Sequence, residues 1–85
     1  MSWLRIEFLP SAAGDFRTLP SDIRPRVTLS IDNLGRSPEL GKPLQGPYSS
    51  LRSLPVGEYR IVYRWDARTW AIIIHRIGHR KDIDP

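Results

Sequence analysis

The sequence predicts an α+β fold with the element order β-α-α-β-β-β, in which an N-terminal strand and a helical hairpin pack on one face of a small, mostly antiparallel sheet. Three observations predict it. Apolar residues recur at helical spacing between Ala12 and Leu34. Residues 59–65 alternate between apolar and polar, a period of two that is typical of a half-buried strand. Residues 70–74 form a continuous β-branched and aromatic run, which fits a central strand buried on both faces.

A proline separates the first strand from the first helix. Residues 3–8 alternate apolar and polar side chains, and Pro10 ends the strand that they predict. Ser11 is a good N-cap for a short helix that carries Phe16 and Leu19 on one face. The proline that follows Leu19 breaks this helix.

A second helix is expected to begin at the cap residue Ser21. Its apolar face consists of Ile23, Val27, Ile31 and Leu34. Pro25 falls in the first turn, where its missing N–H costs little. Gly35 is predicted to take the left-handed conformation just past the helix, and Pro38 prevents any continuation.

The second half of the chain is expected to hold three strands. Residues 39–50 are rich in Gly, Pro and Ser, which predicts a loop. Residues 51–54 follow as a short strand, and Pro55 either ends that strand or marks an edge of the sheet, because it cannot donate a hydrogen bond. Gly57 permits a tight turn into the alternating strand, and residues 66–68 are a polar break short enough for a hairpin.

Several other polar and aromatic side chains of these strands are expected to serve the fold. The aromatic residues Tyr59, Tyr63, Trp65 and Trp70 are able to stack on bases, but on strands of a small domain we expect all four to be core residues. His75 is interpreted as a hydrogen-bonded histidine on its strand. Glu58 and Asp66 flank strand ends and are expected to set turns.

Length and composition bound the class of protein. The length of 85 residues predicts one small domain over residues 1–85. The chain has no cysteine, which excludes a disulfide framework and a thiolate metal site and fits a reducing cytoplasm. It has no apolar run long enough to span a membrane and does not begin like a signal peptide, so no membrane association is expected. Net charge is +4, and residues 51–81 hold seven basic against two acidic side chains. This charge balance is equally consistent with a polyanionic partner and with a basic sheet face that only contacts solvent.

The order of elements and three segments resemble the RelE/ParE superfamily of bacterial and archaeal toxins, and more closely its RelE side. The first segment is LGKPLQG at residues 40–46, after the helical hairpin. The second is LRSLPVGEYRIVY at residues 51–63, and the third is IGHRKD at residues 77–82. The combination of GxYRxxY with a terminal GHRK is fairly specific for this superfamily.

The resemblance implies a toxin of a type II toxin–antitoxin system that cuts mRNA, in the best-studied branch on the ribosome. It implies a cognate antitoxin that wraps the toxin and blocks its basic face. The residues that match catalytic positions are Arg60 and Arg80. Arg52 falls near the family's basic residues before the YR strand. Arg64, Arg76 and Lys81 are further candidates for binding RNA.

The chemistry of these residue types agrees with cleavage by the 2′-OH of RNA. Arginine is always charged and can grip two phosphate oxygens, so Arg60 and Arg80 are expected to stabilise the scissile phosphate. An arginine is a poor base, which leaves His79 as a candidate general acid or base, although it is equally well explained as an exposed residue of the tail. No spacing of His and carboxylates predicts a metal site, and no cofactor is expected.

Two departures from the family pattern leave other functions open. Pro55 stands where many relatives have a basic residue, and Asp84 stands near the place where many have a tyrosine. One alternative is a ParE-like poison of DNA gyrase, because the fold is shared across the superfamily and does not fix function. Another is a catalytically weak relative that only binds its antitoxin.

Overall fold

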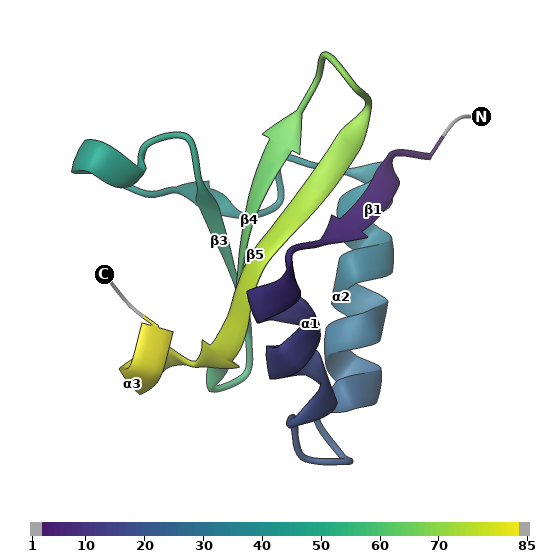
Figure 1. The fold of residues 1–85 in the computed structure, drawn as a ribbon, viewed down its shortest axis with the longest axis vertical. Coiled ribbons are helices and arrows are strands. Elements are labelled where there is room, and N and C mark those ends of the chain that lie inside the picture. Colours follow the sequence, from purple (N-terminus) through teal and green to yellow (C-terminus); the bar gives the residue numbers. More distant parts are fainter. Residues whose placement is uncertain (1–2, 84–85) are drawn as a thin grey trace.

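The structure is a computed structural model that describes residues 3–83. In chain order it comprises β1 (Arg5–Phe8), α1 (Pro10–Arg17), α2 (Arg24–Arg36), β2 (Lys42–Pro43), the 3-10 helix η1 (Gly46–Tyr48), β3 (Arg52–Val56), β4 (Tyr59–Asp66), β5 (Ala71–His79) and α3 (Arg80–Ile83) (Figure 1). This order confirms the predicted α+β plan. It adds β2 and η1 within the predicted loop, and the short helix α3 directly after β5.

The strands form one sheet in the order β1-β5-β4-β3-β2 (Figure 1). β1 runs parallel to β5, and every other neighbouring pair is antiparallel, so the sheet is mostly antiparallel as predicted. The chain between β1 and β5 includes the helical hairpin, which supplies the long connection that a parallel pair requires. β4 and β5 are the long central strands, paired from Tyr59 and His79 to Asp66 and Ala71.

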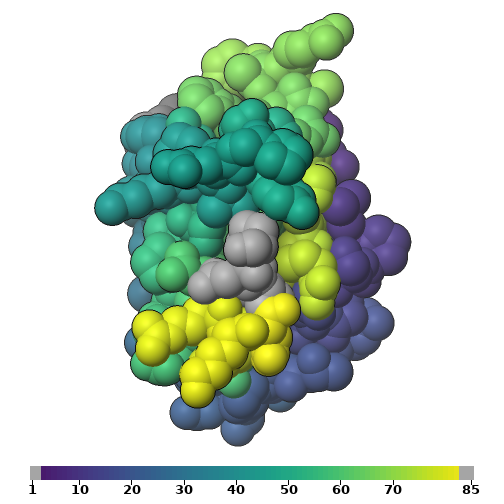
Figure 2. Space-filling view, turned by 90° about the vertical axis from the view of Figure 1, so that its left-hand side faces the viewer, coloured from purple at the N-terminus to yellow at the C-terminus, as the bar shows by residue number. Residues whose placement is uncertain are grey.

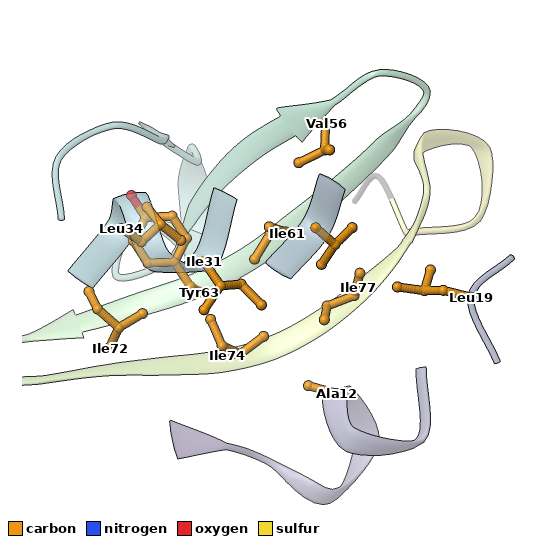
Figure 3. Packing of buried hydrophobic residues seen from close by; sticks show 11 residues of the cluster. Ala12, Leu19, Ile31, Leu34, Val56, Ile61, Tyr63, Ile72, Ile74 and Ile77 are labelled. Atoms are coloured by element: carbon orange, nitrogen blue, oxygen red, sulfur yellow. The ribbon is translucent and has the colours of Figure 1, made fainter. Parts of the chain in front are cut away.

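The helices α1 and α2 cover one face of this sheet, and the hydrophobic core lies between the two layers (Figure 3). The helical hairpin contributes Ala12, Leu19, Val27, Ile31 and Leu34, and the strands contribute Val56, Ile61, Tyr63, Ile72, Ile74 and Ile77. Side chains alternate along a strand, so Arg60 and Arg64 project to the opposite side. We call that opposite side the open face.

Neither helix is capped by the serine that the sequence suggests. α1 begins at Pro10 with Leu9 as its N-cap, and the Ser11 hydroxyl instead donates to the His75 carbonyl at 2.8 Å, which ties the helix to β5. α2 begins at Arg24 without a side-chain cap, so Ser21 does not cap it. Pro25 lies in its first turn, as predicted.

Gly35 lies inside α2, so the prediction of a left-handed glycine past the helix was wrong. Its carbonyl accepts a hydrogen bond from the Leu4 N–H at 3.0 Å. A Cβ at this position would meet the Leu4 carbonyl oxygen at 3.6 Å and the Trp3 ring at 3.8 Å. These are ordinary van der Waals distances, so the close approach of the chain before β1 does not itself require a glycine here.

The tip of the β4–β5 hairpin corrects two core predictions. Asp66 sets the turn as predicted, because its Oδ1 accepts the Arg68 N–H at 3.0 Å. Trp70 follows with a φ of 56°, and its side chain is 67% exposed. Trp65 is also exposed. Both tryptophans therefore lie outside the core, whereas Tyr63 is fully buried as predicted.

A β-bulge interrupts the β4–β5 ladder at His75. Val62 pairs with Arg76 and Tyr63 pairs with Ile74, so His75 is the extra residue. Its Nε2 is buried without a hydrogen-bond partner among residues 3–83, so the prediction of a hydrogen-bonded histidine was wrong. Burial, and then the charge of Arg64, lower the pKa of His75, which keeps the ring neutral at neutral pH.

Among residues 3–83, none of the helices combines the length and the apolar character that spanning a membrane requires.

Candidate functional site

Arg60 is held on the open face by a buried hydroxyl. Strand register places it opposite Pro55 on β3 and Gly78 on β5. Gly78 has no side chain, so the register partner on β5 does not cover the guanidinium. On the other side, Arg60 Nη1 donates to Ser53 Oγ at 3.3 Å, and Ser53 is only 5% exposed. The serine is therefore a fixed partner that orients this arginine.

Arg80 lies at the same end of the β4–β5 ladder. It is the first residue of α3, and its N–H donates to the Glu58 carbonyl at 2.9 Å. This bond fastens the start of α3 to Glu58, which precedes Arg60 by two residues in the chain. The Arg80 Nε also lies 3.7 Å from the Glu58 carboxylate, with about half of the side chain exposed. In Figure 2, α3 (yellow) borders the open face below, and the η1 segment (teal) borders it above.

The structure does not bring His79 together with Arg60. His79 pairs with Tyr59, and their rings meet edge to face at 5.5 Å. Tyr59 packs against the core, which places this pair on the helical side of the sheet. His79 lines a cavity of about 230 Å³ with Tyr59 and Asp15, whereas Arg60 lines a different cavity of about 480 Å³. Its Nε2 is 3.6 Å from the Glu58 carboxylate, and its Nδ1 accepts the Lys81 N–H.

Arg52, one of the candidate RNA-binding residues, makes contacts that hold a loop. It pairs with Tyr63 in register, on the helical side of the sheet. Its Nη1 donates to the carbonyls of Gly41 at 2.7 Å and Glu39 at 3.5 Å. These bonds fasten the segment before β2 to β3.

Arg76 is bound to α1. Its Nε donates to Asp15 Oδ2 at 2.8 Å, and the same carboxylate accepts the Ile77 N–H at 2.9 Å. Burial alone would raise the pKa of Asp15, but the bonds from Arg76 and Ile77 and the charge of Arg76 together hold it below its usual range. The hydrogen bond to Asp15, together with its charge, raises the pKa of Arg76. Arg76 and Asp15 thus join α1 to the part of the β5 edge that lies beyond its pairing with β1.

The remaining predicted cations lie at the surface. Arg64 is on the open face of β4, with its Nη1 3.5 Å from Asp66 Oδ2. Lys81 is exposed in α3. Within residues 3–83, no cluster of three or more His, Cys, Asp or Glu side chains has a geometry that would hold a metal ion.

Sequence reasoning missed three residues of this region. Ser53 orients Arg60, and Glu58 contacts both His79 and Arg80. Lys42 pairs with Ser53 in register, so its exposed side chain shares the open face with Arg60. The proximity of Glu58 to the YR motif was a usable signal for an acidic partner. Lys42 had no such signal, because its strand exists only through pairing with distant residues.

Comparisons with known proteins decide the family. A family model described as "ParE toxin of type II toxin-antitoxin system, parDE" matches residues 6–84. The chain belongs to this toxin family. It is 34% identical over 80 residues to Toxin RelG of Mycobacterium tuberculosis, with 92% of each chain covered. The resemblance to the RelE/ParE superfamily is thereby confirmed.

Solved structures agree with this assignment. The toxin superposes on a chain of the RelBE2 toxin–antitoxin complex of Mycobacterium tuberculosis with a TM-score of 0.84 and 31% identity, covering 92% of this chain and 99% of that one. It matches the isolated RelE toxin of E. coli with a TM-score of 0.78, covering 89% of this chain and 83% of that one. At 20% identity, the second match shows the fold alone.

Of the two departures from the family pattern, the structure describes only Pro55. Pro55 lies in β3 beyond the end of β2, at a free edge of the sheet, so its missing N–H breaks no ladder bond there. It is the register neighbour of Arg60, so this position adds no cation beside that arginine. Asp84 lies outside the described residues.

Proposed function

We propose that this toxin is an mRNA endoribonuclease that acts on the ribosome, with Arg60 and Arg80 stabilising the scissile phosphate. The observation that carries the proposal is Arg60, fixed by Ser53 on the open face, with Arg80 anchored nearby through Glu58. Arg64 and Lys81 add positive charge at the same surface and would contact neighbouring phosphates. The 34% identity to a toxin named RelG supports a RelE-like activity.

The reaction needs no group beyond the RNA and protein side chains. The 2′-hydroxyl attacks the adjacent phosphorus, the bond to the 5′-oxygen breaks, and a 2′,3′-cyclic phosphate and a free 5′-hydroxyl result. One proton leaves the 2′-oxygen and one reaches the leaving 5′-oxygen. Guanidinium groups stabilise the negative charge that accumulates on the non-bridging oxygens.

His79 is the proposed group for one of the proton transfers, because histidine is the commonest general acid or base in enzymes. It faces the helical side of the sheet, so it serves only if the end of β5 rearranges toward the substrate when RNA binds. A His79→Gln variant that cuts as fast as the wild type would remove it from the mechanism. If the variant cuts slowly but regains its rate on a substrate whose 5′-leaving group needs no protonation, His79 is the general acid.

Arginine variants test the central claim. Arg60→Ala and Arg80→Ala should each abolish growth arrest. Each should lower the rate of mRNA cleavage by about a hundredfold or more, because each removes one positive charge from the transition state. The matched control is Arg68→Ala, since Arg68 is exposed at the far tip of the β4–β5 hairpin. Mapping 5′ ends of translated mRNA after induction measures cleavage. Undiminished cleavage by both variants would refute the proposal.

A cognate antitoxin is the proposed protein partner. Several relatives with the same fold were crystallised as toxin–antitoxin complexes. A cavity of about 550 Å³ between β1, α1 and α2 is lined by apolar residues including Ile6, Phe8, Phe16 and Ile31. Its chemistry fits the apolar side of an amphipathic segment. A Phe16→Asp variant should lose antitoxin binding while retaining toxicity, and unchanged affinity would place the antitoxin elsewhere.

A second candidate is a poison of DNA gyrase, favoured by the match to a family described by its ParE members. A gyrase supercoiling assay with the purified toxin separates the two activities. Inhibition of supercoiling without cleavage of translated mRNA would select the gyrase function. Absence of both would leave a binding module for the antitoxin.

A further inference from the structure

The cavity beside Arg60 combines apolar walls with two cations. It measures about 480 Å³, within the range of small-ligand sites. Leu40, Leu44 and Pro55 provide apolar surface, while Lys42 and Arg60 bring positive charge. Register places the side chains of Lys42, Ser53 and Arg60 on the same face of three adjacent strands. An anion joined to a flat apolar group would match this lining better than either group alone.

The wall formed by residues 40–44 is fastened from the opposite side of the sheet. The Tyr63 hydroxyl accepts the Gly41 N–H at 2.9 Å and donates to the Pro38 carbonyl at 2.6 Å. Arg52 adds a 2.7 Å hydrogen bond to the Gly41 carbonyl. The cavity wall is thus held by buried and partly buried hydrogen bonds before any ligand arrives, which lowers the entropy cost of binding.

We propose that this cavity binds one nucleobase of single-stranded RNA, with the attached phosphates at Arg60 and Lys42. The inference rests on the proposed nuclease function and names the part of the substrate that the site receives. Proline and leucine side chains give apolar contact to a base without a hydrogen-bonding code, so the shape of the cavity, and not base pairing, sets the preference. Neighbouring strands are roughly 5 Å apart, and Arg60 is offset by two residues from the register of Lys42, so the two backbones stand roughly 12 Å apart. Two long side chains at that separation can reach the phosphates on both sides of one nucleotide.

Binding is measured with probes that cannot be cut. Trinucleotides with 2′-O-methyl riboses and a varied central base are titrated into the full chain, and amide chemical shifts are followed. We expect shifts at Leu44, Ser53 and Leu54 with a preference among bases. The cavity-filling variant Leu44→Trp should weaken binding about tenfold. Its matched control is Leu29→Trp, because Leu29 is 63% exposed on α2, outside this cavity.

A second variant keeps the test valid if Leu44→Trp does not fold. Lys42→Ala removes one cation at an exposed position and should reduce the slope of log K against log salt by about 0.7. An unchanged slope, or probe-induced shifts confined to other surfaces, would overturn the proposal. So would shifts at this cavity that appear only with the antitoxin and never with the probe.

Cleavage experiments distinguish failure of this inference from failure of the nuclease proposal. If Leu44→Trp cuts translated mRNA at altered bases, the cavity reads the base as proposed. If it cuts at the same bases and the same rate, the cavity inference fails and the nuclease proposal stands. If the wild type cuts no mRNA and the probe does not bind here, both fail together.

Discussion

Tyr63→Phe is the sharpest probe of the wall beside Arg60. Tyr63 is fully buried, and its hydroxyl makes two hydrogen bonds, to the Gly41 N–H and the Pro38 carbonyl. Burial raises the pKa of Tyr63, so the hydroxyl stays protonated and remains a donor at neutral pH. Phenylalanine fills the same core position but leaves both main-chain groups without this partner.

The expected loss follows from those two bonds. Each net hydrogen bond is worth about 1 kcal/mol, and a buried donor left without an acceptor costs about 1 kcal/mol more. We therefore expect the free energy of unfolding to fall by about 2–3 kcal/mol, which corresponds to a decrease in Tm of roughly 8–24 °C for a domain of this size. Because the loss is local, the Gly41 amide should also exchange with solvent much faster.

Urea unfolding and amide hydrogen exchange measure the two effects. The matched control is Tyr48→Phe, which removes the hydroxyl of a tyrosine that is 46% exposed in η1 and should be neutral within about 0.5 kcal/mol. If Tyr63→Phe is as stable as that control and Gly41 remains protected, the hydroxyl does not hold the wall.

Three further predictions concern stability. Asp15→Asn should lower the free energy of unfolding by about 1 kcal/mol at neutral pH, after allowance for the half-exposed Arg76. Urea unfolding of this variant should show a smaller loss of stability in acid than the wild type. The sign follows from the lowered pKa of Asp15, whose contribution is full above its unfolded pKa of about 3.9 and is lost as pH falls through the folded value. The pKa of His75 is also lowered, so its protonation should reduce stability as pH falls below about 6.5, and thermal unfolding of His75→Leu should lack that decline. Gly41→Ala should destabilise by about 1–3 kcal/mol, because a Cβ would lie 2.7 Å from the Tyr63 ring, whereas Gly14→Ala in α1 should stabilise by about 0.5–1 kcal/mol, and opposite signs in urea melts are the check.

Sequence patterns predicted the elements whose signals are local. The alternation in β4, the apolar run in β5 and the apolar face of α2 each lie within one stretch of chain, so all three could be placed. β2 has two residues and exists only because Lys42 and Pro43 pair with β3. The serine caps were wrong because Ser11 bonds to a carbonyl 64 residues away. That partner is visible only in the folded chain.

The same limit applies to the candidate site. Arg60 and Arg80 could be named because a motif carries them, and the structure puts them at one end of the ladder. Their neighbour Ser53 could not be identified, since a serine in turn-rich sequence has many uses, whereas Glu58 lies close enough to the YR motif to be a usable signal. Trp70 was expected in the core from its apolar character, but its φ of 56° places it in the turn. The apolar character of a residue does not reveal that the folded chain turns at its position.

The count of basic residues overstates the charge that this surface offers to a polyanion, because Arg52 and Arg76 are bound within the protein. Charge-matched variants separate the two classes. Arg76→Gln should lower the free energy of unfolding by about 1 kcal/mol through its lost contact with Asp15, and should leave the salt slope of single-stranded RNA binding unchanged. Lys81→Gln removes the same charge from an exposed position, and should reduce that slope by about 0.7 without affecting stability. Equal slopes for the two variants would mean that Arg76 leaves Asp15 to bind RNA, and that the ion pair at the edge of β5 opens with the substrate.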